Sequence, residues 1–118
     1  ISITAESLSV TNGAQLSATT SARGNAGNVT INTRNFVYLD GVDNLGFPSG
    51  IFSRVNPDGI GQGGNISIAA ESVNITNGAV LTANTRGQGD AGSIAITARD
   101  RVFVDGVDRE GFPTAILS

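Results

Sequence analysis

The sequence contains no His and no Cys, so Asp and Glu are its side chains best suited to binding a metal or moving a proton. Two pairs of acids recur beside Gly: Asp40 with Asp43, and Asp105 with Asp108. Clustered oxygen ligands of this kind suit Ca²⁺. The Gly-Gly-x-Gly-x-Asp repeat of calcium-binding solenoids is absent, however, and Asp beside Gly is a common turn former. We therefore expect these acids to form turns, with calcium as the alternative and no other cofactor.

Paired carboxylates could also cleave glycosidic bonds, provided that two of them converge on one cleft. Here the Asp residues recur at the spacing of a sequence repeat, which is where a repeat architecture would place them. The Gly-rich segments 24–27 and 87–92 resemble phosphate-binding loops, but the chain has no Lys and no helical pattern to complete such a site. We expect no catalytic residue and no enzyme activity.

The composition excludes two further classes of function. The net charge is -3 and the few basic residues, all Arg, form no basic face, so we expect no binding to nucleic acid. No apolar run approaches the roughly 20 residues of a membrane span, so we expect no membrane insertion. The apolar residues are mostly Ile, Val, Leu and Ala, which suit flat, closely stacked strands.

An internal repeat is the strongest signal in the sequence. Ile1–Ser7 returns almost unchanged as Ile66–Ser72, and every other match has the same offset of 65 residues. About half of the overlapping positions are identical. Each long repeat splits into a shorter and a longer unit, and the four units start near Ile1, Val29, Ile66 and Ile94. The longer second and fourth units carry insertions at 42–49 and 107–114.

Each unit contains three short segments in which apolar and polar residues alternate, which is the signature of β-strands. The alternating pairs are Ile1/Ile3, Val29/Ile31, Ile66/Ile68 and Ile94/Ile96 in the first segment, Leu8/Val10, Val37/Leu39, Val73/Ile75 and Val102/Val104 in the second, and Leu16/Ala18, Ile51/Ser53, Leu81/Ala83 and Ile116/Ser118 in the third. The second segment starts one residue later in the longer units, which indicates a bulge or a longer corner.

Three strands per unit, joined by corners too short for a crossover helix, predict an all-β fold of the β-solenoid type, a parallel β-helix. We expect about four coils of three short strands, with two coils in each 65-residue repeat and a rise of about 4.8 Å per coil. The first long repeat covers 1–65 and the second covers 66–118. Because the chain starts and stops within strand segments, we expect a piece of a larger protein, stacked on neighbouring repeats or end to end on copies of itself.

Two ladders of polar residues support this register. The first consists of the turn residues that precede Gly, namely Asn12, Asp40, Asn77 and Asp105. The second alternates in charge up another corner and consists of Glu6, Arg34, Glu71 and Arg99. Like charges stacked at that corner would repel, so we expect this order of charges to help set the register.

The two Gly-Phe-Pro insertions are the best candidates for binding loops, because insertions in solenoids map to loops on one face. They would bring Phe47, Phe112, Asp108 and Arg109 to one side of the rod. The competing expectation, which we favour, is that each Phe folds back and covers apolar side chains on the flank.

Three segments, Gly24–Ile31, Leu8–Leu16 and Gly46–Phe52, carry a resemblance that extends over essentially the whole chain. They resemble the repeat region of filamentous-haemagglutinin-like exoproteins of Gram-negative bacteria, which are exported by two-partner secretion. The segment Asn56–Ile60 looks like a motif of that family's secretion domain, but its surroundings differ, and we interpret it as a turn.

The resemblance implies a right-handed parallel β-helix that an outer-membrane partner exports to the bacterial cell surface. It also implies a role in adhesion or matrix formation. We therefore expect an extracellular structural rod segment of an adhesin, sheath or filament. The alternative is a carbohydrate-binding or carbohydrate-cleaving extracellular β-helix protein, with surface glycans as its partners. The absence of His, Lys and Trp favours the rod over the enzyme.

Overall fold

The computed structural model describes residues 1–107, 111 and 113–118, which form strands and turns without a helix. The strands are β1 (Ser2–Ala5), β2 (Leu8–Thr11), β3 (Gln15–Ser17), β4 (Val29–Thr33), β5 (Phe36–Asp40), β6 (Gly50–Val55), β7 (Ile66–Thr76), β8 (Val80–Thr85), β9 (Ile94–Asp105) and β10 (Ala115–Leu117). The protein is therefore all-β, as the alternating pattern predicts.

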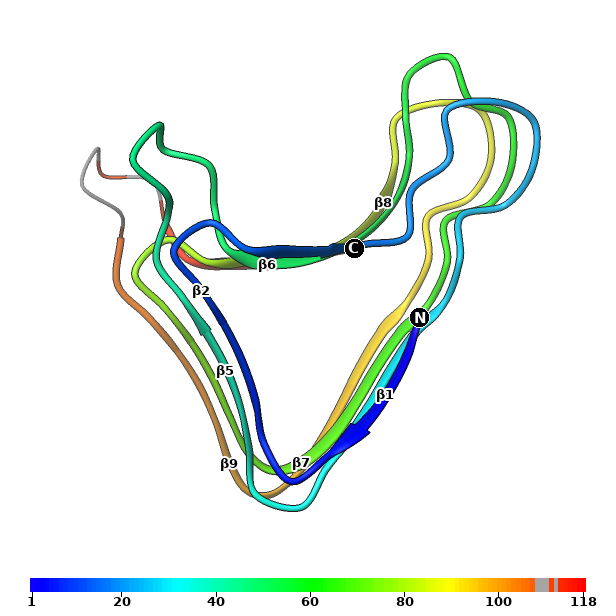
Figure 1. Cartoon of the computed structure of the whole chain (residues 1–118). Coiled ribbons are helices and arrows are strands. Elements are labelled where there is room, and N and C mark those ends of the chain that lie inside the picture. Colours follow the sequence, from blue (N-terminus) through cyan, green and yellow to red (C-terminus); the bar gives the residue numbers. More distant parts are fainter. Residues whose placement is uncertain (108–110, 112) are drawn as a thin grey trace.

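The strands pair in parallel and form two sheets. One sheet has the order β1-β4-β7-β5-β2, with β9 also paired to β7, and the other has the order β10-β8-β6-β3. All pairings between these strands are parallel. The chain curls along a roughly triangular path, and successive units overlie one another in the view of Figure 1. Corresponding strands of neighbouring units are thus the ones that pair.

The register confirms the predicted columns of inward side chains. The first column is Ile3, Ile31, Ile68 and Ile96, and the other is Leu16, Ile51, Leu81 and Ile116. Members in the middle units are buried almost completely, and those in the first and last units are covered on one side only. Stacked aliphatic side chains therefore make one continuous core.

The three strand segments of each unit lie on three sides of the triangular path, and we number these sides in chain order (Figure 1). In the longer units, one extra residue lengthens the corner between the first and second sides. Ala70 pairs with Ala98, but Ser72 pairs with Arg101, so β9 takes three steps where β7 takes two. The same difference recurs where β4 is followed by β5. This confirms the longer corner that the sequence predicts for these units.

One inward position of the third side is polar. Ser53 is fully buried, and its Oγ donates a hydrogen bond to the Gly27 carbonyl oxygen at 2.8 Å. A buried hydroxyl with a partner avoids most of the cost of leaving water. Ser53 therefore ties the third side of the second unit to the Gly-rich corner that leads into that unit.

Replacing Ile68 by Ala should lower the free energy of unfolding by about 2–5 kcal/mol, because the change removes buried methyl groups and leaves a cavity between two neighbouring units. Urea denaturation followed by circular dichroism measures this loss. The matched control is Ser67→Ala, an exposed position on the same strand, which should change stability by no more than about 0.5 kcal/mol. Equal effects of the two substitutions would contradict the inward placement of Ile68.

Candidate functional site

The predicted ladder of Asn12, Asp40, Asn77 and Asp105 needs a correction by one residue. These residues share a corner, but Asp40 pairs with Thr11 and Thr76 rather than with the two Asn residues. Asp105 likewise pairs with Thr76. The reason is the extra residue at the preceding corner of the longer units, which shifts their second strand by one position against the short units.

The position that repeats at this corner is a left-handed backbone conformation. Asn12 and Asn77 have φ values of 56° and 53°, and the residues that lie level with them in the longer units, Gly41 and Gly106, have φ values of 75° and 87°. Asn and Gly are the residues that adopt this conformation most readily. A bend in the backbone, rather than one kind of side chain, is thus what the four units have in common here.

Asp40 and Asp43, the two candidate calcium ligands of the second unit, both accept hydrogen bonds. The Asp40 Oδ1 accepts hydrogen bonds from Thr76 Oγ1 at 2.6 Å and from Asn77 Nδ2 at 2.7 Å. The Asp43 Oδ1 accepts from the backbone N–H groups of Leu45 and Phe47 at 2.8 and 2.9 Å. Over the described residues, no three acidic side chains gather into a group that could hold a metal ion. Asp43 thus stabilises the turn that follows it, as expected, whereas Asp40 joins its own unit to the next one.

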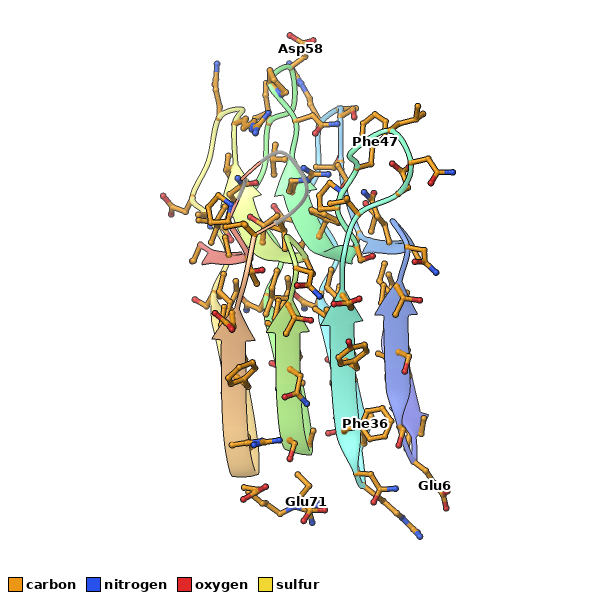
Figure 2. All side chains as sticks on the ribbon, turned by 90° about the vertical axis from the view of Figure 1, so that its left-hand side faces the viewer. Glu6, Phe36, Phe47, Asp58 and Glu71 are labelled. Atoms are coloured by element: carbon orange, nitrogen blue, oxygen red, sulfur yellow. The ribbon has the colours of Figure 1, made fainter. Side chains whose placement is uncertain are left out.

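The insertion 42–49 is a small hairpin that projects from the corner. The Asp43 N–H donates to the Phe47 carbonyl oxygen at 2.8 Å, and Gly46 closes the turn with a φ of 87°. Leu45 is 80% exposed and Phe47 is 56% exposed, so Phe47 does not fold back onto the flank as we expected (Figure 2). Asp108, Arg109 and Phe112 of the second insertion lie outside the described residues.

The four charges of the second ladder lie at the opposite end of this side of the molecule, where Figure 2 labels Glu6 and Glu71. Within the part of the chain that the structure describes, no ion pair joins these four side chains. Arg99 instead donates from Nη2 to the Arg34 carbonyl oxygen at 2.6 Å, two units away. The order of charges still separates like charges, and its contribution to register stays a prediction.

The Gly-rich segments that resemble phosphate loops are stacking elements. Three Gly-x-x-Gly segments, 24–27, 61–64 and 89–92, lie one above another at the third corner, joined by backbone hydrogen bonds between successive units. A Cβ on Gly61 or Gly89 would overlap the carbonyl group of the Gly below it, and so would a Cβ on Gly64 or Gly92. We did not predict this role from the sequence, although the same spacing of two Gly residues recurs in three units.

A polar groove of about 470 Å³ runs beside these stacked loops. Asn25, Asn28, Gln62, Asn65 and Asp90 lie along it. The Oδ1 atoms of Asn25 and Asn28 accept backbone N–H bonds from Gln62 and Asn65, each at 2.8 Å. Their Nδ2 groups have no partner among the described residues. The groove therefore offers hydrogen-bond donors and one carboxylate to a polar ligand.

Aromatic side chains gather on the outer face of the second side. Phe36 and Tyr38 point outward from β5, and Phe103 points outward from β9. Phe36 is 41% exposed and Phe103 is 45% exposed. The intervening strand β7 has the small polar residues Ser72 and Asn74 at the paired positions. We did not predict this face, because the alternating pattern was used only to find inward residues.

No family model, curated protein or solved structure matches this chain. A search of the described residues for a long apolar helix that could cross a membrane found none. Inference about function therefore starts from the stacked units, the polar groove and the aromatic face themselves.

The substitution Gly64→Ala should destabilise the protein by about 1–3 kcal/mol, because the new Cβ would overlap the Gly27 carbonyl group and press on Ser53 Oγ. The control is Gly27→Ala in the same column, whose Cβ would meet only the Ala18 Cβ at 3.3 Å. Thermal unfolding of both variants measures the difference. If Gly27→Ala proved as damaging as Gly64→Ala, the close backbone stacking of these loops would be refuted.

Proposed function

We propose that this chain is a rod-forming stretch of a right-handed parallel β-helix with about four coils, in which the four sequence units are the coils. The observation that supports this proposal best is the in-register pairing of corresponding strands on all three sides. Each unit completes the core of its neighbour, which is the property that lets repeat arrays extend without a fixed limit. The role that follows is mechanical: to hold surfaces at a distance or to build a filament.

We propose further that the rod belongs to a secreted bacterial surface adhesin, sheath or filament, exported with an outer-membrane partner. The residue segments that resemble filamentous-haemagglutinin repeats support this placement. The engagement of Asp40 and Asp43 in hydrogen bonds also fits a structural role better than a catalytic one. The chain is proposed to have no enzyme activity.

The rod is proposed to grow end to end. The outer edges of β1 and β3 in the first unit, and of β9 and β10 in the fourth, have no paired strand among the described residues. Such edges are templates for another chain. The fourth unit is a longer unit and the first is a shorter one, so a contact between them would repeat the one that the second unit makes with the third. This head-to-tail arrangement does not close and leads to filaments.

We expect the isolated chain to form elongated oligomers as its concentration rises, because its end edges can pair with other copies. Light scattering over a concentration series would report the growth in mass, and small-angle X-ray scattering would report the growth in length. A particle that stays monomeric at the highest soluble concentration, with both ends covered by local loops, would argue against end-to-end growth.

A second candidate function is the binding of surface glycans, and the polar groove beside the Gly-rich loops favours it. Amide and carboxylate groups such as those of Asn25, Asn28 and Asp90 hydrogen-bond to hydroxyl groups. If this function is present, neutral oligosaccharides should shift the NMR signals of the groove residues, and Asn25→Ala with Asn28→Ala should abolish the shift. Release of new reducing ends during the same titration would show the carbohydrate-cleaving alternative, whereas unchanged spectra would exclude both.

A further inference from the structure

The outer face of the second side alternates between large and small side chains from unit to unit. We call it the ridged face and define it by the outward residues of β2, β5, the second half of β7 and the second half of β9. Its decisive residues are Phe36, Tyr38, Ser72, Asn74, Arg101 and Phe103. Tyr38 lies between Ser9 and Asn74, and Asn74 lies between Tyr38 and Phe103.

This alternation makes ridges and grooves that both repeat every two units. Units follow one another at about 4.8 Å, so the aromatic ridges of the second and fourth units are about 9.6 Å apart. Ser72 and Asn74 of the third unit form the floor of the groove between them. Exposed aromatic residues of this size are typical of protein interfaces rather than of an uninvolved surface.

The ridged face is complementary to itself. A two-fold axis that lies in the interface, parallel to the strands and between the second and third units, places two such faces against each other with their units stacked in opposite directions. The second unit then lies over the third, and the fourth lies over the first. Every aromatic ridge then meets a groove of small residues: Tyr38 lies over Asn74 of the second copy, and Phe103 lies over Ser9 of the second copy. Two-fold contacts of this kind use the same surface on both copies.

We infer that the ridged face is a lateral docking surface for a second copy of this chain, antiparallel to the first. This inference goes beyond the proposed end-to-end growth and does not depend on it, because it uses only a face of the units and not their edges. Phe47 of the exposed hairpin lies beside the upper end of the face and extends its apolar area (Figure 2).

The size of the face sets the strength of the pairing. Four strands about 4.8 Å apart, with five residues of about 3.3 Å each, give a face of roughly 19 by 17 Å. This is about 300 Å² for each copy, below the roughly 800 Å² of a standard stable interface. Pairing of one four-unit chain is therefore weak and reversible, and it strengthens as more units join the same rod.

The first experiment is sedimentation equilibrium of the 118-residue chain over a wide concentration range, combined with small-angle X-ray scattering. We expect the cross-section of the particles to increase with concentration, which distinguishes lateral pairing from end-to-end growth, because end-to-end growth alone increases only the length. The double variant Phe36→Ser with Tyr38→Asn should weaken pairing at least about tenfold, the effect of losing roughly 1.4 kcal/mol of binding free energy. The third unit already has Ser72 and Asn74 at these positions, so the fold accommodates the change.

The matched control is Ile60→Asn, which removes an exposed apolar side chain from the Gly-rich corner, away from the ridged face. This variant should pair like the unmodified chain, and circular dichroism should show all variants folded. Undiminished pairing in the Phe36→Ser with Tyr38→Asn variant would overturn the inference. So would a chain that never increases its cross-section, including one whose aromatic face responds only to added oligosaccharides.

A second experiment tests the antiparallel geometry. Because the chain has no Cys, Asn74→Cys introduces a single thiol close to the proposed two-fold axis. A short bismaleimide should join two such chains through this position. Ser67→Cys, which is on the same strand but on another side of the molecule, should give no such product. Equal cross-linking at both positions would indicate random collision and would overturn the proposed orientation.

Discussion

Each unit of this chain depends on the unit beside it, because three short strands alone can neither bury their apolar side chains nor satisfy their backbone N–H and C=O groups. Parallel pairing in register imposes a strict condition: every residue must be compatible with the residue one strand spacing above and below it. The Ile68 column satisfies this condition by filling space. The column that contains Gly64 satisfies it through the absence of side chains, since a Cβ on Gly64 or Gly92 would meet the backbone of the neighbouring unit.

The inward columns could be predicted from the sequence because strand alternation has a period of two, so a slip of one residue would turn Ile31 or Ile68 toward solvent. The Asn and Asp corner could not be predicted to the residue. An alignment by residue type places Asp40-Gly41 opposite Asn77-Gly78. In the structure, however, the pairing of the strands depends on the number of residues since the previous corner, and it places Asp40 opposite Thr76. The longer corner is visible in the sequence, and its extra residue is what places Asp40 level with Thr76 in the turn that follows.

The candidate sites consist of outward and loop residues. The alternating pattern does not show which residues these side chains contact or hydrogen-bond. Asp40 and Asp43 resemble metal ligands in sequence, but a donor from the next unit or the next turn engages each of them. The aromatic face was hidden for a related reason. Phe36 and Phe103 stand at outward positions of their strands, where the alternating pattern predicts polar residues. Only the pairing of β5 and β9 with β7 shows that aromatic residues recur on alternate units.

The alternation of shorter and longer units also limits how a gene for such a chain can lengthen or shrink. Loss of the third unit alone would place two longer units next to each other, with Asp40 directly beside Asp105 and Tyr38 beside Phe103. Adjacent carboxylates at about 4.8 Å would repel, and Asp40 would lose the Thr76 and Asn77 donors that the third unit supplies. Duplication or deletion is therefore tolerated in steps of the whole 65-residue repeat, so the heritable module of this protein is a pair of units rather than a single one.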